Sequence, residues 1–502
     1  MKEVLYKYNK DTIIKTNDKG GIKVDEGIMT VDIGTSSIRV SLFDLQGNVI
    51  GRKSAEAFAP AQFDAEEQLE KMLSLMRQVR ETYSSIEVVR ICTSTLVSWT
   101  FTGKDGMAIT PVYTFSDYHE EEMQKFLGVF DERDFYERTG RSVSAEHPIF
   151  KFMWLREVYP EKYENADKLL SYQGYINLRF TGNAFMDRTF AAFTGLYNLK
   201  EENWDQKILQ AANVDGEKLP RLCECSHIVG TLTKEMQKIL GMGAVQVVNG
   251  TIDGTSGVLG SGVIAPYAGV DVMGTTDVFY VISDKPVFEK QARLSVHPHP
   301  VKGLWLIGGA TGLTGGAFDW AVKVLGQGNL SYDDVNRKME QIPPGSEGLK
   351  AVCAFAGERA PRWLPKIRGG FANLTLEHTL AHCCKALSEA SAYVTKEICR
   401  LLEQEGLQVG EITAIGGGAK AHTILQIRSD VLNCTVNVPE YPDATSRGCY
   451  TLAMMSLGKD INEIDINRKV EKICPDSDRA FSYEGLYKDY IAFYEHYKKI
   501  YE

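Results

Sequence analysis

The sequence predicts an α/β protein of two large domains related by duplication. A chain of 502 residues is longer than one hydrophobic core usually serves, so two domains are the default expectation. The stretch VDIGTSSIRVSLFD at 31–44 reads as a strand, a Gly-Thr-Ser turn and a second strand, and VDVMGTTDVFYVI at 270–282 repeats that pattern in the other half of the chain. An internal repeat of this kind is typical of a duplicated domain.

The bulk composition is that of an ordinary globular protein, and it disfavours several classes of partner. Hydrophobic residues make up 44% and charged residues 24% of the chain, and the net charge is −10. No basic block stands out, so nucleic acid is disfavoured. No run is apolar and long enough to cross a membrane, and the polar first residues lack the core of a signal peptide. Ten scattered cysteines without paired CxxC motifs predict reduced thiols in a cytoplasmic protein and no zinc site.

The chain divides into an extension and two domains. We place an N-terminal extension without assignable chemistry at 1–27, the first domain at 28–262 and the second at 263–502. In the first domain, apolar residues alternate along 38–42 as in a strand and recur at helical spacing along 66–83. Further strands are expected at 88–93, 112–115 and 245–248, with a helix that follows Pro148.

In the second domain, a strand at 304–307 leads into the glycine-rich stretch GGATGLTGG at 308–316. We expect a loop there, at which the backbone approaches a ligand near Gly316, before a helix that begins near Ala317. Next come an ordered loop at 353–379, a helix at 380–404 and, at the end, a helix at 483–501 whose aromatic rings pack inward.

Another glycine loop follows a strand at 412–415, where GGGAK at 416–420 leads into a helix. A strand, a glycine loop and a helix in this order suit a nucleotide whose sugar or base lies on Gly417, Gly418 and Ala419. The stretch matches neither a Walker loop nor GxGxxG. A plain glycine cap and turn is the alternative.

Asp253 is the candidate catalytic residue. It lies at the end of an apolar strand within QVVNGTIDGTSGVLGSG, and Gly250, Gly254 and Gly257 leave room for a ligand beside it. A carboxylate in such a place suits a general base that must touch a substrate hydroxyl and a phosphate together. The alternative is that Asp253 only caps the helix that follows.

The two Gly-Thr turns are candidate phosphate sites. Backbone N–H groups and hydroxyls at Gly34, Thr35 and Ser36, and again at Gly274 and Thr275, can hold phosphate oxygens. Two such turns that face each other could hold one nucleotide from both sides.

Candidate substrate contacts follow two strands of the first domain. Thr95 and Leu96 come after the strand at 88–93, and ligands gather at the carboxyl ends of strands in open α/β sheets. Asp117 follows the strand at 112–115 and could accept hydrogen bonds from sugar hydroxyls, or it could be a solvated loop residue. Lys151 could reach an anion or lie on the surface. His119 has no metal-binding partner at a suitable spacing.

Taken together, six motifs in order resemble the FGGY family of carbohydrate kinases, from residue 28 to the C-terminus. They are VDIGTSSIRVSLFD, HPIFKFMWL, GTIDGTSG, GTTD, FAGERAPRW with RGGFANLTLEHT, and IGGGAKAHTILQIRSDVL. The resemblance implies the actin, Hsp70 and hexokinase ATPase fold, with duplicated ribonuclease H-like domains and a cleft between them. It places the sugar on the first domain and ATP on the second.

The resemblance also implies a role for each candidate residue. Asp253 would be the base that takes a proton from a primary hydroxyl of a small sugar, and Asp32 would hold Mg²⁺. A pentulose or another ketose is the first expectation, and a sugar acid or polyol also fits. The Gly34–Ser36 and Gly274–Thr275 turns would bind the phosphates of ATP, and a homodimer is compatible with the family. The remaining expected contacts are adenosine on Gly316, Gly417, Gly418 and Ala419, and the sugar on Thr95, Leu96 and Asp117.

The sugar-side motifs depart from the family pattern. Xylulokinases usually carry Gln-Met-His-Gly where this chain has TLVS at 95–98, and Trp-x-Asp-x-Arg where it has FSDYH at 115–119. The departures leave a kinase intact but do not identify its sugar. They also motivate an alternative, a catalytically weak sensor that binds nucleotide and sugar. A peptide-stimulated ATPase on the same fold is disfavoured, because the chain has no separate peptide-binding domain.

Overall fold

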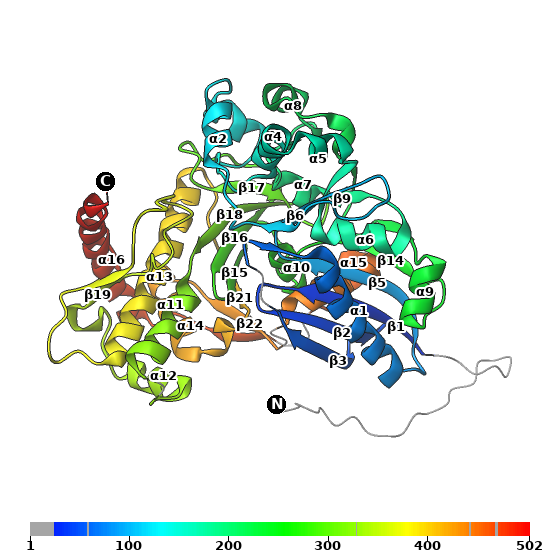
Figure 1. Ribbon diagram of the computed structural model, residues 1–502. Helices are drawn as coiled ribbons and strands as arrows, with labels where there is room; N and C mark the ends of the chain where they lie inside the picture. Colours follow the sequence, from blue (N-terminus) through cyan, green and yellow to red (C-terminus); the bar gives the residue numbers. More distant parts are fainter. Residues whose placement is uncertain (1–24, 58–59, 328, 441–442, 467–469, 502) are drawn as a thin grey trace.

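The computed structural model describes residues 25–57, 60–327, 329–440, 443–466 and 470–501 (Figure 1). Residues 1–24 of the expected N-terminal extension lie outside these residues. Within the described part of the chain, no helix has the length and apolar character needed to span a membrane. All ten cysteines are free thiols.

Two large mixed sheets organise the molecule. The first has the order β13-β14-β5-β1-β2-β3 and the second β17-β18-β16-β15-β21-β22-β23. The strands of the first sheet are β1 Glu26–Ile33, β2 Ser37–Asp44, β3 Val49–Glu56, β5 Glu87–Thr95, β13 Ile228–Thr231 and β14 Gln246–Ile252. Those of the second are β15 Gly269–Met273, β16 Asp277–Ser283, β17 Ser295–Pro298, β18 Trp305–Gly312, β21 Ile412–Ile415, β22 Val436–Pro439 and β23 Val470–Ile473.

The two sheets repeat one topology, which confirms the predicted duplication. In the first, the antiparallel strands β3, β2 and β1 are followed by the parallel strands β5 and β14 and the antiparallel strand β13. In the second, β18, β16 and β15 are followed in the same way by β21, β22 and β23. The hairpins predicted from the two Gly-Thr turns are β1–β2 and β15–β16.

Short strands form smaller sheets around the large ones. One sheet has the order β4-β7-β6-β8, and the other strands form the pairs β9–β12, β10–β11 and β19–β20. Their bounds are β4 Gln62–Phe63, β6 Ser98–Thr102, β7 Val112–Thr114, β8 Lys168–Ser171, β9 Phe185–Asp187, β10 Tyr197–Asn198, β11 Asn203–Trp204, β12 Arg221–Cys223, β19 Lys350–Val352 and β20 Gly370–Ala372.

Helices cover the sheets on the outside and also lie between them (Figure 1). They are α1 Ala65–Thr82, α2 Glu120–Leu127, α3 Glu132–Thr139, α4 Pro148–Val158, α5 Pro160–Asn165, α6 Tyr172–Thr181, α7 Arg188–Ala192, α8 Gln206–Ala212, α9 Lys234–Leu240, α10 Asp253–Gly260, α11 Thr314–Trp320, α12 Tyr332–Glu340, α13 Leu380–Gln404, α14 His422–Leu432, α15 Ala444–Ser456 and α16 Ser477–Tyr497.

Local signals in the sequence account for several of these helices. Asp64 caps α1, since its carboxylate accepts the N–H groups of Glu66 and Glu67, and the predicted apolar stripe of this helix is buried. The helix predicted at 380–404 is α13, with the same bounds. The tyrosines of α16 pack inward as predicted, although the helix begins earlier, after its cap Asp476.

The loop predicted at 308–316 is wrong over its first residues, because β18 continues to Gly312. A Cβ at Gly308 would lie 2.0 Å from the carbonyl oxygen of Phe279 on the neighbouring strand β16, and Gly308 has φ +147°. Glycine is needed there for the close approach of two strands rather than for a ligand loop.

Helices α10 and α15 cross between the two lobes in direct backbone contact. A Cβ at Gly260 of α10 would lie 1.8 Å from the carbonyl oxygen of Ala444, and one at Gly448 of α15 would lie 1.9 Å from that of Ser256. Val258 of α10 packs in the core of the second sheet. Cys449 of α15 packs in that of the first. Each half of the chain therefore contributes one helix to the hydrophobic core of the other half.

We expect Gly448→Ala to destabilise the protein by about 1–3 kcal/mol, the usual cost of forcing extra volume into a packed contact. Gly485→Ala in α16 is the matched control, because nothing lies within 4 Å of a Cβ there and alanine favours a helix. Thermal unfolding of both variants checks this: the first should melt lower and the second no lower than the wild type. Equal melting temperatures would contradict the close contact.

Candidate active site

Three parallel strands of the first sheet end at the same edge and bring the predicted site residues together. Ile33 of β1 is opposite Thr95 of β5, and Thr95 is opposite Ile252 of β14. The next residues along these strands, Gly34, Leu96 and Asp253, therefore lie side by side. The backbone N–H of Leu96 donates to the carbonyl of Ile33 at 2.8 Å, which fixes this arrangement.

Asp253 is the first residue of α10, and its carboxylate Oδ1 accepts the N–H of Gly254 at 2.7 Å. The N-cap of this helix is Ile252, so the alternative that Asp253 serves as the helix cap is wrong. Burial raises the pKa of Asp253 to about 6, against the opposing effects of the Gly254 hydrogen bond and the positive charge of Arg39. A carboxyl group with a pKa near the working pH is suited to proton transfer.

Arg39 connects two carboxylates around this edge. Its guanidinium lies 2.7 Å from Asp32 and 3.5 Å from Asp443, which the second half of the chain contributes just before α15. Arg52 also forms an ion pair with Asp443. Burial raises the pKa of Asp32 to about 7; Arg39 lowers it, and the carboxylates of Asp443 and Asp253 raise it further.

The predicted nucleotide residues gather at the corresponding edge of the second sheet. Val272 of β15 is opposite Ile415 of β21, so the turn at Gly274 and the loop at Gly417 follow neighbouring strand ends. The N–H of Gly316 donates to the carbonyl of Thr275 at 3.0 Å. A Cβ at Gly418 would lie 2.9 Å from the Cβ of Met273, whereas Gly417 faces open space. The 3₁₀ turn 418–420 includes Ala419, which is buried.

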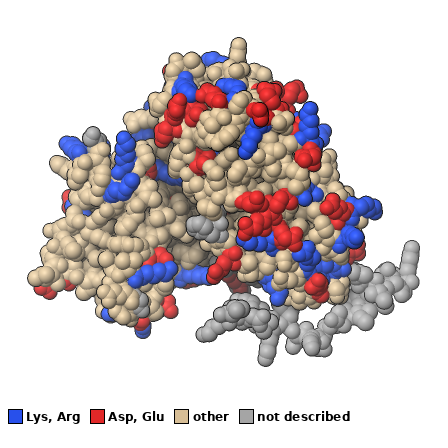
Figure 2. Space-filling model, in the orientation of Figure 1, with Lys and Arg blue, Asp and Glu red and all other residues tan. Residues whose placement is uncertain are grey.

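The two edges approach each other across α10. The Thr445 hydroxyl, from the first turn of α15, donates to the carbonyl of Asp253 at 3.4 Å. Thr35 and Thr275, the equivalent residues of the two Gly-Thr turns, are both exposed. The surface is hollowed between the two lobes in the space-filling view, and charges of both signs are interspersed on the visible face (Figure 2).

Asp117 lies outside the strand-end group, after β7 of the small four-stranded sheet. Its carboxylate accepts hydrogen bonds from Gln62 and His119, each at 2.9 Å, and lies 3.4 Å from the Lys151 ammonium. Burial alone would raise the pKa of Asp117, but these three partners lower it below its ordinary value. Asp117 is therefore not a solvated loop residue. The surface position considered for Lys151 is also wrong, since its side chain is fully buried.

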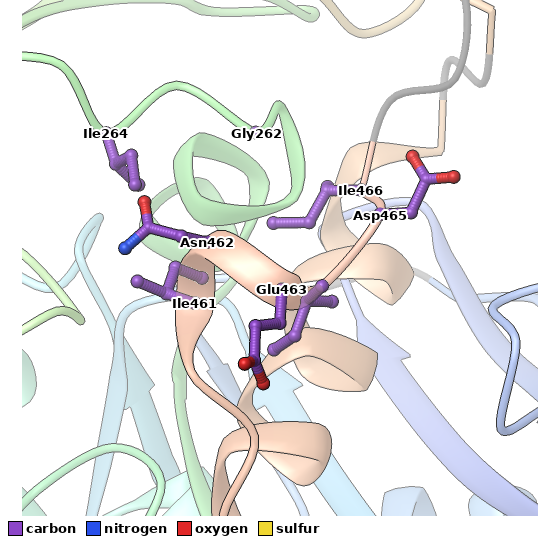
Figure 3. Close-up of a pocket in the computed structure, with 8 residues that line it drawn as sticks. Gly262, Ile264, Ile461, Asn462, Glu463, Asp465 and Ile466 are labelled. Atoms are coloured by element: carbon purple, nitrogen blue, oxygen red, sulfur yellow. The ribbon is translucent and has the colours of Figure 1, made fainter.

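Two pockets formed by the described residues lie elsewhere. One of about 440 Å³ is formed by Gly262, Ile264 and residues 461–466 (Figure 3). Another, of about 780 Å³, is lined by Tyr267 and by residues of α13 and its following loop. Neither includes a predicted site residue.

Asp32 fits a role in magnesium binding. One of its carboxylate oxygens is buried and has an ion-pair partner in Arg39 but no hydrogen bond. In the described part of the chain, no three His, Cys, Asp or Glu side chains are grouped as a metal site. Mg²⁺ needs no such group, because it is commonly held by one or two carboxylates together with substrate phosphates and water.

Sequence reasoning missed Arg39 and Asp443. Arg39 carries a local signal, since it is a charged residue between Ile38 and Val40 in the strand that follows the Gly-Thr turn. Asp443 precedes a helix as an ordinary cap residue does, and only the fold places it beside Arg39.

Comparisons with known proteins show which family the chain resembles in sequence. The model of the FGGY family of carbohydrate kinases, N-terminal domain, matches residues 27–260, and that of the C-terminal domain matches residues 269–457. A xylulose kinase of Lactococcus lactis subsp. lactis is 25% identical, over 94% of this chain and 97% of its own length. A gluconokinase of Bacillus subtilis is 26% identical, over 86% of this chain and 88% of its own.

A solved structure shares the fold. The ligand-bound xylulose kinase from Lactobacillus acidophilus superimposes with a TM-score of 0.88 at 24% identity, over 95% of this chain and 99% of that one. The two-domain fold that the motifs predicted is thereby confirmed.

Proposed function

Because the chain belongs to the FGGY family of carbohydrate kinases, we propose that it transfers the γ-phosphoryl group of ATP to a primary hydroxyl of a small sugar, with Asp253 as the general base. The observation that carries the assignment of the base is the strand register, which sets Asp253 beside the Gly34 turn. The second Gly-Thr turn stands at the matching edge of the other sheet.

In the proposed reaction, the sugar hydroxyl lies against the Asp253 carboxylate. That carboxylate accepts the hydroxyl proton as the sugar oxygen bonds to the γ-phosphorus, and the bond from phosphorus to the β-phosphate oxygen breaks to release ADP. The Gly34–Ser36 and Gly274–Thr275 turns hold the phosphates with N–H groups and hydroxyls. Phosphoryl transfer depends mainly on such positioning and on electrostatic stabilisation.

The remaining ligands are assigned in the same proposal. Asp32 holds Mg²⁺ when ATP is bound, and the ion supplies neutralisation of phosphate charge. Gly316, Gly417, Gly418 and Ala419 border the adenosine. The sugar contacts Thr95, Leu96 and, farther from the base, Asp117. Free cysteine thiols support a cytoplasmic location, and the homodimer stays a prediction.

The names of the relatives indicate which classes of sugar to test. Their names are xylulose kinase and gluconokinase, so the range to test covers ketoses, which are neutral, and sugar acids, which are not.

A coupled ADP-release assay over ketoses, sugar acids and polyols tests the proposal. We expect one class to give turnover at ordinary enzyme rates. ATP binding without turnover on any compound would favour the nucleotide- and sugar-binding sensor instead.

We expect the activity to fall in acid. The pKa of Asp253 is raised to about 6, so its basic form is present above that pH and is lost as the pH falls below it. Therefore kcat/KM should decline tenfold per pH unit below about 6. The assay is run at saturating Mg²⁺, which competes with protonation of Asp32, and ADP added directly controls for the coupling enzymes at each pH. A flat profile down to pH 5 would contradict the assignment.

A further inference from the structure

Arg141 is a buried arginine with incomplete pairing, at a place where the first half of the chain contacts Ser295 of the second half. It follows the end of α3, is 7% exposed, and its guanidinium lies 4.1 Å above the ring of Phe193. Within the described residues, its side-chain hydrogen bonding is confined to one long contact, 3.4 Å from Nη1 to the Ser295 hydroxyl. A buried guanidinium is costly unless it is paired and hydrogen-bonded.

The carboxylate beside Arg141 is already engaged elsewhere. Glu146 lies 3.9 Å from Arg141 Nη2, but 3.0 Å from Nη2 of Arg359. Two guanidinium groups therefore share one carboxylate. Arg141, Arg359 and Glu146 together carry a net charge of +1. The neighbouring Lys151 does not alter this count, since it has its own carboxylate in Asp117.

Tyr280 links this group to the proposed base. Burial raises the pKa of the Tyr280 phenol to about 12; Arg141 and Arg359 lower it, and Asp253 raises it. The geometry gives the same proximity. Tyr280 of β16 is opposite Gly308 of β18, which is opposite Ser295, the hydrogen-bond partner of Arg141. The Tyr280 ring also packs in one cluster with Val258 of α10, the helix that Asp253 begins. A molecule that bridges the base and the two arginines would have a hydroxyl at one end and an anionic group at the other.

We propose that Arg141, with Arg359, binds the carboxylate of a sugar acid whose far hydroxyl is presented to Asp253. This substrate class rests on the proposed kinase function. Guanidinium and carboxylate are planar and pair through two parallel hydrogen bonds, which gives both affinity and specificity. A neutral ketose would leave the surplus charge buried and unpaired. A sugar phosphate would bring nearly two negative charges to a surplus of one.

Paired substrates test the proposal in the wild-type enzyme. Aldonates of five and six carbons are compared with the alditols and ketoses of the same length, and with their phosphates. We expect kcat/KM for one aldonate to exceed that of its alditol at least a hundredfold, because buried charge pairs discriminate strongly against a partner that lacks the charge. A neutral ketose or a sugar phosphate as the preferred substrate would overturn the proposal.

The variant Arg141→Met removes the charge and keeps most of the volume. We expect it to raise KM for the aldonate about thirtyfold or more while changing the slow reaction of the alditol less than threefold, and Arg141→Lys should recover part of the loss. Arg77→Met on α1, where the arginine is 35% exposed, is the control. Equal losses on both substrates would mean that Arg141 has only a structural role.

Ligand-induced thermal stabilisation separates this proposal from the kinase function. The wild-type protein is heated with each compound and a non-hydrolysable ATP analogue. An aldonate that raises the melting temperature, while its alditol does not, supports the carboxylate subsite even if no turnover is found. Absence of stabilisation by every aldonate overturns the subsite, whatever the neutral sugars do.

Discussion

We expect Asp253→Asn to lower kcat by about two to four orders of magnitude, the usual contribution of a positioned general base. Asparagine keeps the shape of the side chain and the acceptor that binds the Gly254 N–H, but it cannot take up the hydroxyl proton. The affinity for ATP should be nearly unchanged, because the base acts on the sugar. The ADP-release assay gives kcat, and calorimetric titration gives ATP binding.

The control is Asp489→Asn, which removes an exposed carboxylate from α16. It should leave both measurements as they are in the wild type. Turnover of Asp253→Asn within about threefold of the wild type would refute the role of the base. Loss of ATP binding together with turnover would instead indicate damage to the site as a whole.

The second large effect concerns a charge network beneath the Gly274–Thr275 turn. Arg428 of α14 is 2% exposed and lies 3.2 Å from Asp271 of β15 and 3.0 Å from Asp277 of β16. Ser391 of α13 donates to the same Asp277 oxygen at 3.0 Å. Asp277 is the first residue of β16, two positions after the turn, so this network fixes the strands that carry the turn.

We expect Arg428→Met to reduce the free energy of unfolding by about 3–5 kcal/mol, because it leaves two buried carboxylates without their cation. Urea unfolding of the full-length protein measures this. Arg400→Met is the control, since that arginine of α13 is 39% exposed and its ion pair with Glu484 should contribute about 1 kcal/mol or less. Equal losses in the two variants would contradict the importance of burial.

The loss in Arg428→Met should depend on pH in a defined direction. Burial raises the pKa of Asp271, and Arg428 opposes the rise. Without the arginine, the folded-state pKa should rise further above the unfolded value, so the neutral form is favoured in the folded protein. Stability then falls as the pH rises toward that folded pKa. The difference from the wild type should accordingly be smaller at pH 5 than at pH 8, and the reverse order would contradict the assignment.

Local sequence patterns predicted those parts of the molecule whose structure depends on interactions between residues close together in the chain. Alternation and glycine turns gave both hairpins, and helical spacing gave α1. The rule that ligands gather at the carboxyl ends of strands singled out Thr95 and Leu96, whose strand ends beside Asp253. The strand pairing of the structure follows the same logic.

What sequence reasoning missed depends on contacts between distant segments. Arg39 and Asp443 are 404 positions apart, and no local pattern indicates their pairing. Arg141 looks like any polar residue after a helix, and only the fold buries it against Ser295 of the second half. Lys151 was ambiguous for the same reason, since Asp117, its partner, is 34 positions earlier. Charge pairs of this kind are set by the docking of whole lobes.

The glycine crossing of α10 and α15 has a mechanical consequence. If the two lobes rotate relative to each other, the close backbone contact between α10 and α15 is the natural pivot. The displacement of any atom then grows with its distance from this pivot. Asp253 begins the same short helix that bears Gly260, about 10 Å along its axis, whereas α2 and α12 lie at the far ends of the lobes (Figure 1). In such a rotation, α2 and α12 would move far enough to admit ligands, whereas the Asp253 carboxylate would move little.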